Sequence, residues 1–370
     1  MRRFIFSFCI LLIASLACSG EAKSIPPTPK NSIFDSGKTA YGFYPSPPEV
    51  SLDSVFQLYK DMGAHGDFVL IQQNTAWEDF VNGADGKSQT RTDIINQTIL
   101  ASQNDLETIF VIDALNGLNR REFSGLPAGW DANFANPNVR TAYKNFALWV
   151  VRTFHPHYLG LASEINTYMD AHPDDAQNFI SLYNEMYTLI KAEAPGTQIF
   201  VSFQWDDLNN MFPQPEEGNR QPLQPNWEQI KAFEPNLDIW VISTYPYFIF
   251  NNETQIPADY YTPLLTRTDK PVAIAEGGFS SQAIGEIQVT STDQVAYLNA
   301  IHTQLGPRLA FWVNTLLDDL NIDSYAEQMK KDGRDPQDAQ SLGAFAHIGL
   351  RNSDGTPRPA LEVWNEFRNR

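Results

Sequence analysis

Short apolar runs recur along the chain, and most of them are followed by a segment with the spacing of an amphipathic helix. A run of about four to eight apolar residues, bounded by turn-forming residues, is typical of a strand that is buried on both faces. We expect such strands near residues 39–44, 67–72, 108–113, 158–164, 199–204, 238–244, 271–276 and 309–313. The pattern therefore predicts a series of buried strands along one chain.

The segments between these runs carry helix signals. Ser51 is a suitable N-cap, and Pro195-Gly196 is a stop signal. We expect helices near 52–62, 92–102, 138–154, 174–194, 227–233, 258–266, 292–305 and 359–367, with a long polar loop after the third strand. Strands that alternate with helices at this spacing form a parallel sheet, which closes into a barrel when there are eight of them.

The predicted fold class is therefore α/β, as a single (β/α)8 barrel or TIM barrel. An open doubly wound sheet is the alternative. That fold usually carries a glycine-rich phosphate-binding turn after its first strand. Here the corresponding turn is Pro45-Ser-Pro-Pro48, which contains no glycine, so the turn favours the barrel.

The N-terminus has the order of a targeting segment. Arg2 and Arg3 precede the apolar run Phe4–Leu16, which is too short to span a bilayer comfortably and ends in small residues. We therefore assign residues 1–17 to a signal peptide, 18–35 to a tether and 36–370 to the barrel domain. The expected location is extracytoplasmic.

Cys18 directly follows Leu16-Ala17, and this order is similar to a bacterial lipoprotein cleavage site, although Leu16 and Ser15 depart from the usual pattern. Lipidation of Cys18, which would tether the chain to a membrane, and plain cleavage with secretion both remain open. Mass spectrometry of the exported protein distinguishes them. The other cysteine, Cys9, lies inside the signal peptide, so we expect neither a disulfide nor a thiolate metal site in the barrel.

The composition of the chain indicates which classes of binding partner to expect. The formal net charge is −18, which argues against binding of nucleic acid or of an anionic membrane surface. Aromatic residues make up 12% of the chain, which suits a groove that stacks on sugar rings, although large cores also hold aromatics. We expect a monomer without a cofactor or metal. The pair Asp318-Asp319 is interpreted as part of a solvated loop.

Two glutamates end two of the expected strands. Glu164 closes the run that begins at Tyr158, and Glu276 closes the run that begins at Pro271. A carboxylate is costly to bury inside a strand, but at the C-terminal end it can point into a barrel mouth, where barrel enzymes keep their chemistry. Paired carboxylates cleave glycosidic bonds. For either glutamate alone, a salt bridge to a barrel lysine or arginine is the competing interpretation.

With an acidic residue ending the fourth strand and another ending the seventh, the chain resembles the clan A glycoside hydrolases, which are retaining (β/α)8 glycosidases. The closing segment 349–361 is also similar to the C-terminal end of many members. Among the branches, endo-β-1,4-galactanases and some β-mannanases are nearest, and the branch stays open. Ser163 departs from the pattern, because most members have an asparagine there that binds the sugar 2-hydroxyl.

The resemblance implies that Glu164 is the acid/base and Glu276 the nucleophile. A general acid needs a raised pKa and a nucleophile must stay ionised, a state that Tyr245 could favour by donating to Glu276. We expect Trp312 to form a sugar platform beneath the cleavage point. The complete set of expected substrate-binding residues is Tyr44, Asn74, Trp77, Asp113, Ser163, Gln204, Trp205, Tyr245 and Trp312.

Three functions are compatible with these residues. The first is an exported, retaining β-glycosidase that hydrolyses O-glycosidic bonds in a polysaccharide or oligosaccharide by double displacement. The second is a carbohydrate-binding protein built on a catalytically impaired barrel, with Ser163 as a sign of lost activity. The third is a transglycosylase that uses the same two glutamates with a sugar as acceptor.

Overall fold

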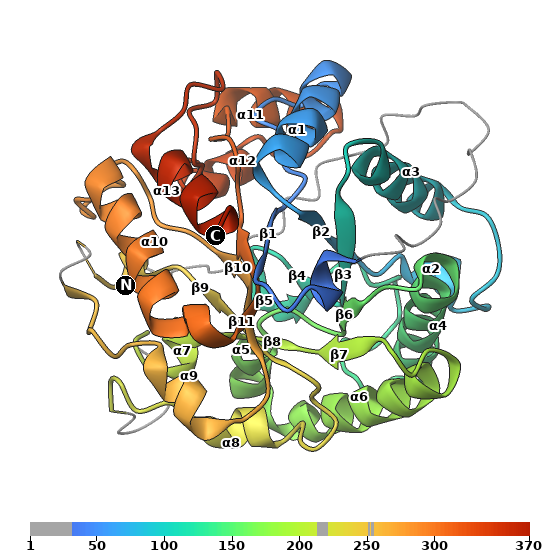
Figure 1. Ribbon diagram of the computed structural model, residues 1–370. Coiled ribbons are helices and arrows are strands. Elements are labelled where there is room, and N and C mark those ends of the chain that lie inside the picture. The colour runs from blue at the N-terminus through green and yellow to red at the C-terminus, as the bar shows by residue number, and fades with distance from the viewer. Residues whose placement is uncertain (1–31, 213–220, 251, 253–254) are drawn as a thin grey trace.

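A computed structural model describes residues 32–212, 221–250, 252 and 255–370 (Figure 1). The predicted signal peptide and most of the predicted tether lie outside these residues. Within the described part of the chain, no helix is both long and apolar enough to cross a membrane.

A parallel sheet forms the centre of the molecule, with the strand order β7-β6-β3-β2-β1-β11-β10-β9-β8 (Figure 1). Its strands are β1 (Ala40–Phe43), β2 (Phe68–Asn74), β3 (Glu107–Asp113), β6 (Tyr158–Gly160), β7 (Gln198–Phe200), β8 (Ser202–Gln204), β9 (Trp240–Thr244), β10 (Val272–Gly277) and β11 (Leu309–Asn314). The runs expected from the apolar pattern are all strands in this sheet.

The two ends of the sheet are consecutive pieces of one strand. β7 and β8 are separated only by Val201, and β7 pairs with β6 while β8 pairs with β9. The backbone N–H of Ser202 also donates to the carbonyl of Ala162 at 3.1 Å, which continues the pairing past the break. The sheet therefore closes on itself as an eight-stranded barrel, and the predicted fold class is confirmed.

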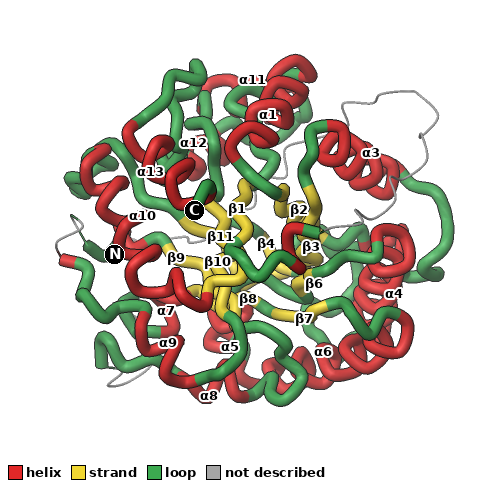
Figure 2. Tube along the Cα trace, viewed as in Figure 1, coloured by secondary structure: helices red, strands yellow, loops and turns green. Residues whose placement is uncertain are grey.

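Helices surround the barrel (Figures 1 and 2). Those that the sequence predicted appear as α1 (Leu52–His65), α3 (Gln89–Gln103), α4 (Pro137–Phe154), α6 (Pro173–Glu193), α8 (Trp227–Lys231), α9 (Thr262–Arg267), α10 (Ser291–Leu305) and α13 (Pro359–Arg368). The side chain of Ser51 accepts a hydrogen bond from the N–H of Ser54, so it caps α1 as expected.

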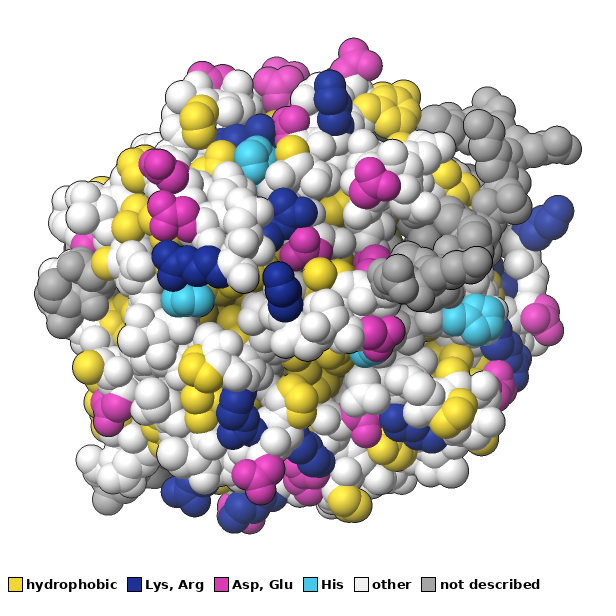
Figure 3. All heavy atoms as spheres, in the orientation of Figure 1, with side chains coloured by type: hydrophobic (Ala, Val, Ile, Leu, Met, Phe, Trp, Pro, Cys, Tyr) yellow, Lys and Arg dark blue, Asp and Glu magenta, His cyan; other side chains and the backbone are white. Residues whose placement is uncertain are grey.

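Shorter helices, which the sequence did not predict, lie in the loops. They are η1 (Ile33–Asp35), α2 (Trp77–Phe80), α5 (Ile165–Ala171), α7 (Trp205–Leu208), η2 (Pro246–Phe248), η4 (Gly306–Arg308), α11 (Ile322–Lys331) and α12 (Gln337–Leu342). On the face shown in Figure 3, acidic and basic side chains are interspersed and do not gather into a single patch.

Aromatic rings fill one end of the barrel. Phe311 of β11 contacts Phe68 of β2, Tyr158 of β6 and Phe200 of β7. These strands are not neighbours of β11, so the rings meet through the barrel interior. Gly42 makes room for them, because a Cβ at that position would lie 2.6 Å from the ring of Phe68. Phe311 therefore points inward, which fixes the phase of alternation along β11.

A two-stranded antiparallel hairpin, β4 (Leu115–Asn116) and β5 (Asn119–Phe123), follows β3 at the barrel mouth. This segment was expected to be a polar loop, and that expectation is wrong. The Asn116-Gly117 dipeptide is a typical hairpin signal. The side chain of Asn74 donates to the carbonyl of Leu115 at 2.8 Å, and the indole N–H of Trp77 donates to the carbonyl of Ser124 at 2.7 Å. These bonds anchor the base of the hairpin to the barrel.

The interpretation of Asp318-Asp319 as a solvated loop is also wrong. Both residues are only 3% exposed. The carboxylate of Asp318 forms a bidentate pair with the guanidinium of Arg351, with N–O distances of 2.6 and 2.8 Å, and Asp319 pairs with Arg358. Burial of two carboxylates is tolerated here because each has a guanidinium partner. The pairs join the loop after β11 to the closing segment of the chain.

The buried pair predicts a large stability effect. Arg358→Met should lower the free energy of unfolding by about 3–5 kcal/mol, because it leaves Asp319 buried without its guanidinium partner. The matched control is Arg370→Met, which removes the 63% exposed partner of Glu366 in the last helical turn and should cost about 0–1 kcal/mol. Urea unfolding of both variants checks this. Equal losses in the two would contradict the proposed weight of the buried pair.

Candidate active site

The backbone presents Glu164 in an unusual conformation. Glu164 follows β6 as the N-cap residue of α5, with φ 49° and ψ 42°, in the left-handed region. A residue with a side chain adopts this region at a cost of order 1–3 kcal/mol, so the surrounding structure must hold it there. The N–H of Glu164 donates to the hydroxyl of Ser202 at 3.0 Å, which fixes the turn to the neighbouring strand. The carboxyl group is thereby aimed into the mouth.

Glu276 lies on β10, at an irregularity where the pairing register with β9 shifts between Ile274 and Glu276. Irregularities of this kind re-aim side chains next to functional sites. The hydroxyl of Tyr245 donates to Glu276 Oε1 at 2.9 Å, and the hydroxyl of Tyr44 lies 3.2 Å from Oε2. The hydroxyl of Ser163 is 3.5 Å from the same oxygen. Hydrogen bonds to a carboxylate favour its ionised form.

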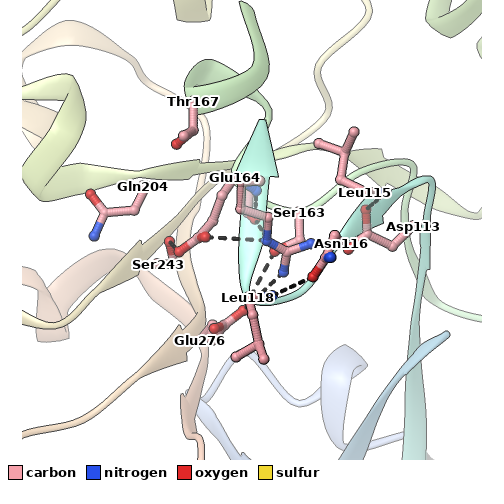
Figure 4. A network of polar contacts seen from close by, with 12 residues as sticks. Asp113, Leu115, Asn116, Leu118, Ser163, Glu164, Thr167, Gln204, Ser243 and Glu276 are labelled. Atoms are coloured by element: carbon pink, nitrogen blue, oxygen red, sulfur yellow. Dashed lines mark hydrogen bonds and ion pairs between the residues drawn. The ribbon is translucent and has the colours of Figure 1, made fainter. Parts of the chain in front are cut away.

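Arg120 of β5 contacts both glutamates, whose side chains are labelled in Figure 4. Its Nε is 3.3 Å from Glu164 Oε2, and its Nη2 is 3.9 Å from Glu276 Oε2. Its Nη1 contacts the carboxylate of Asp113, which ends β3. Asp113 in turn accepts hydrogen bonds of 3.0 Å from the side chain of Gln72 and from the N–H of Leu115. The guanidinium is therefore held in place from the side opposite the glutamates.

The surroundings of Glu164 keep it protonated. Burial, followed by the negative charge of Glu276, raises the pKa of Glu164 from 4.5 to about 8, while Arg120 opposes the rise. Glu164 Oε1 accepts a hydrogen bond from the hydroxyl of Ser243 at 2.5 Å, whereas Oε2 is buried and accepts none. The raised pKa therefore marks Glu164 as the group that carries a transferable proton. A general acid at neutral pH needs this combination.

Four of the expected substrate-binding residues gather around the glutamates. Tyr44, Ser163 and Tyr245 contact Glu276, and Asp113 contacts Arg120. Each is at most 4% exposed, and Glu164 and Glu276 are 1% and 0% exposed. These side chains are therefore almost fully buried. Among the described residues, no group of three or more His, Cys, Asp or Glu side chains could hold a metal ion.

Four other expected residues make structural contacts. Asn74 and Trp77 anchor the hairpin, and Trp77 also stacks on Tyr143. Gln204 accepts a hydrogen bond from the N–H of Asp207 and caps α7. Trp205 is fully buried against other aromatic rings and is unavailable as a surface for a sugar. For the two tryptophans, the expected sugar contact is corrected to core packing.

Trp312 also does not face the mouth. Because Phe311 points into the barrel, the next residue points out, and Trp312 packs against Trp364 and Phe367 of α13 with no exposed surface. The expected sugar platform at this position is therefore wrong. On the inward side near the mouth lies Thr315, whose hydroxyl is 2.9 Å from that of Tyr245 and accepts from the N–H of Gly277 at 2.9 Å.

Sequence reasoning missed Arg120, the residue that connects the two glutamates, and Ser243, which binds Glu164. Arg120 could have been found through the hairpin signal at Asn116-Gly117, which places the next residues at the mouth after the third strand. Ser243 interrupts an apolar run just before the end of the sixth strand, which marks a polar side chain near the mouth.

Comparison with known proteins finds similarity to solved structures but none in sequence. No protein-family model matches the chain, and no curated protein matches its sequence. An exo-β-1,4-mannosidase, Op5Man5 from the Opitutaceae bacterium strain TAV5, is similar in structure with a TM-score of 0.62 at 14% identity, over 90% of this chain and 59% of that chain. This chain thus spans less than two thirds of the length of that protein.

Two further solved structures have the same likeness. GH5_18 from Bifidobacterium longum subsp. longum ATCC 55813 has a TM-score of 0.62 at 13% identity, over 90% of this chain and 79% of that one. Xylanase 10B from Thermotoga maritima has a TM-score of 0.59 at 11% identity, over 90% and 96% of the two chains. At these identities the likeness shows the fold, which these glycoside hydrolases share with this chain.

The raised pKa of Glu164 predicts a pH-dependent stability difference. Between pH 4.5 and about 8 the folded chain keeps a proton that the unfolded chain releases, so the stability contributed by Glu164 falls as pH rises through this window. Glutamine does not titrate. The unfolding free energy of Glu164→Gln should therefore gain on that of the wild type by up to about 1.4 kcal/mol per pH unit.

Urea midpoints measured at several pH values check this prediction. The matched control is Glu228→Gln, which changes a side chain that is 79% exposed and should show no such trend. A constant difference between Glu164→Gln and the wild type across the window would contradict a raised pKa.

Proposed function

We propose that the chain is an exported, retaining β-glycosidase that hydrolyses O-glycosidic bonds in an oligosaccharide or polysaccharide. One observation carries the proposal: two buried carboxyl groups meet at the barrel mouth in opposite environments. Glu164 has a raised pKa and an oxygen that accepts no hydrogen bond, whereas Glu276 lies against two tyrosine hydroxyls. Pairs of titratable groups with such contrasting surroundings are typical of acid/base and nucleophile assignments.

In the first step, a carboxylate oxygen of Glu276 attacks the anomeric carbon, and the glycosidic C–O bond breaks. The proton of Glu164 passes to the departing oxygen, so Glu164 becomes ionised while Glu276 becomes a neutral glycosyl ester. In the second step, Glu164 takes a proton from water, and the water oxygen attacks the anomeric carbon. The ester bond breaks, Glu276 is released as a carboxylate, and Glu164 is protonated again.

Retention requires the two carboxyl groups to lie about 5–5.5 Å apart, whereas inversion leaves roughly 6.5–9.5 Å for a water molecule. Two features support the shorter separation. One guanidinium contacts both glutamates, and the charge of Glu276 is the second largest cause of the raised pKa of Glu164. Both features weaken quickly as the distance between the carboxyl groups grows.

The names of the similar structures support a β-linked sugar as substrate. One is an exo-β-1,4-mannosidase, and another is a xylanase. A variant of the Bifidobacterium GH5_18 was solved in complex with Manβ1-4GlcNAc, at a TM-score of 0.61 and 13% identity to this chain over 90% of it and 78% of that chain. The sugar and the choice between endo and exo action are assigned by a polysaccharide and oligosaccharide screen scored by released reducing ends. Export is proposed from the order of residues 1–17.

A second candidate is a carbohydrate-binding protein on a catalytically impaired barrel. The observation that favours it is that both glutamates are at most 1% exposed and both contact Arg120. Ser163 in place of the asparagine of the clan A pattern also fits this candidate. A panel of aryl glycosides separates the two: turnover supports the enzyme, and binding without turnover supports the impaired barrel.

Replacement of each glutamate by alanine should impair a different part of the reaction. Glu276→Ala should be almost inactive because the glycosyl ester cannot form, and added azide should restore turnover with a glycosyl azide of inverted configuration. Glu164→Ala should lose about 10²–10⁴-fold on poor leaving groups and far less on dinitrophenyl glycosides, which need little protonation. With azide, its product should have retained configuration. Initial rates and NMR of the products measure both.

The control for these variants is Glu228→Ala, which changes an exposed residue and should keep wild-type rates. Circular dichroism confirms that each variant is folded. Full activity in Glu164→Ala or Glu276→Ala refutes the assignment of that residue.

A further inference from the structure

A single buried cation contacts both candidate catalytic carboxyl groups. The side chain of Arg120 has no exposed surface, and its guanidinium spans from Glu164 Oε2 at 3.3 Å to Glu276 Oε2 at 3.9 Å. The guanidinium also contacts Asp113, which ends the strand before the hairpin. Its contact with both glutamates therefore points to a role in the reaction.

The double displacement moves one negative charge between these two carboxyl groups. Before the first step, Glu276 is ionised and Glu164 is neutral. After it, Glu276 is a neutral ester and Glu164 is ionised, because its proton has gone to the leaving oxygen. The pair thus holds one negative charge at both stages, but on opposite sides of Arg120. A fixed donor group that faces both positions stabilises the charge without reorganising.

We propose that Arg120 is a further catalytic residue, the shared counter-ion of the charge that passes from Glu276 to Glu164 and back. This role rests on the proposed function. It assigns chemistry to the β4–β5 hairpin, which delivers Arg120 to the mouth, and to Asp113, which positions the guanidinium from the opposite side. Arginine suits the role of shared counter-ion because its charge is delocalised over a planar guanidinium. A lysine ammonium is a point charge that cannot face both carboxyl groups equally.

The groups that act on Arg120 and the two glutamates come from several elements. They are Asp113 of β3, Tyr143 of α4, Glu164 before α5, Glu276 of β10, and the hydroxyls of Tyr44, Tyr245 and Ser243. Replacement of Arg120 removes the guanidinium and leaves the identity of the other groups unchanged. A change in the titration of the glutamates in an Arg120 variant therefore reports the loss of the guanidinium.

The test is the pH profile of kcat/KM for Arg120→Gln and Arg120→Lys on an aryl glycoside that the wild type hydrolyses. Loss of a nearby positive charge raises the pKa of a carboxyl group. Activity needs Glu276 ionised and Glu164 protonated, so both limbs of the profile should move to higher pH in Arg120→Gln. We expect kcat to fall by about 10²–10³-fold, as for removal of one preorganised donor.

Arg120→Lys keeps a positive charge, so its limbs should stay nearer those of the wild type. Stopped-flow release of dinitrophenol separates the two chemical steps. Both steps should slow by about tenfold or more, since neither carboxyl group keeps the delocalised guanidinium beside it. This variant also serves if Arg120→Gln does not fold. Wild-type rates for both steps in Arg120→Lys would overturn the role.

The outcomes also separate this inference from the proposed function. An active wild type with unshifted limbs in Arg120→Gln overturns the role of Arg120 alone and leaves a structural pair with Asp113. A wild type that is inactive on the whole glycoside panel overturns the proposed function and this role together. Shifted limbs together with slowing of both steps support the shared counter-ion.

Discussion

The site depends on the burial of two carboxyl groups around one guanidinium. A carboxylate taken out of water is strongly destabilised unless charge or hydrogen bonds compensate it. Here Glu276 accepts a hydrogen bond from the hydroxyl of Tyr245, and Glu164 stays neutral because its pKa is raised. Arg120 contacts both carboxyl groups. These compensating interactions allow both carboxyl groups to be buried in the folded chain. They also give the two glutamates different protonation states, which a double displacement requires.

The barrel supplies the geometry that this balance requires. Closure through the split strand β7–β8 brings the ends of strands far apart in sequence to one mouth. The left-handed backbone of Glu164 and the register shift beside Glu276 then aim each carboxyl group. Such local irregularities lower stability, and burial of the apolar barrel interior offsets this loss.

Much of the fold could be predicted from the sequence because the strands of a parallel barrel are continuous apolar runs with clear ends. The two glutamates stood out as charges at those ends. The orientation of Trp312 was predicted wrongly because every residue around it in the run is apolar, so the sequence does not show which residues face the barrel interior. Neighbouring residues of a strand point to opposite faces, and a shift of one residue turns a side chain from the interior towards a helix. Arg120 was missed, and Asp318-Asp319 was misinterpreted as a solvated loop, for another reason. The role of each depends on partners that are distant along the chain, up to 156 residues for Arg120 and Glu276.

The most direct measurement is a search for a covalent glycosyl-enzyme. In activated 2-deoxy-2-fluoro glycosides the fluorine slows both chemical steps, whereas the good leaving group speeds the first step only. A retaining enzyme incubated with such a compound therefore accumulates its glycosyl ester. The account predicts that mass spectrometry of the digested protein finds one sugar on the peptide that contains Glu276, and that Glu276→Ala carries none. An adduct on Glu164, or turnover of the parent glycosides with inverted product and no adduct, would contradict it.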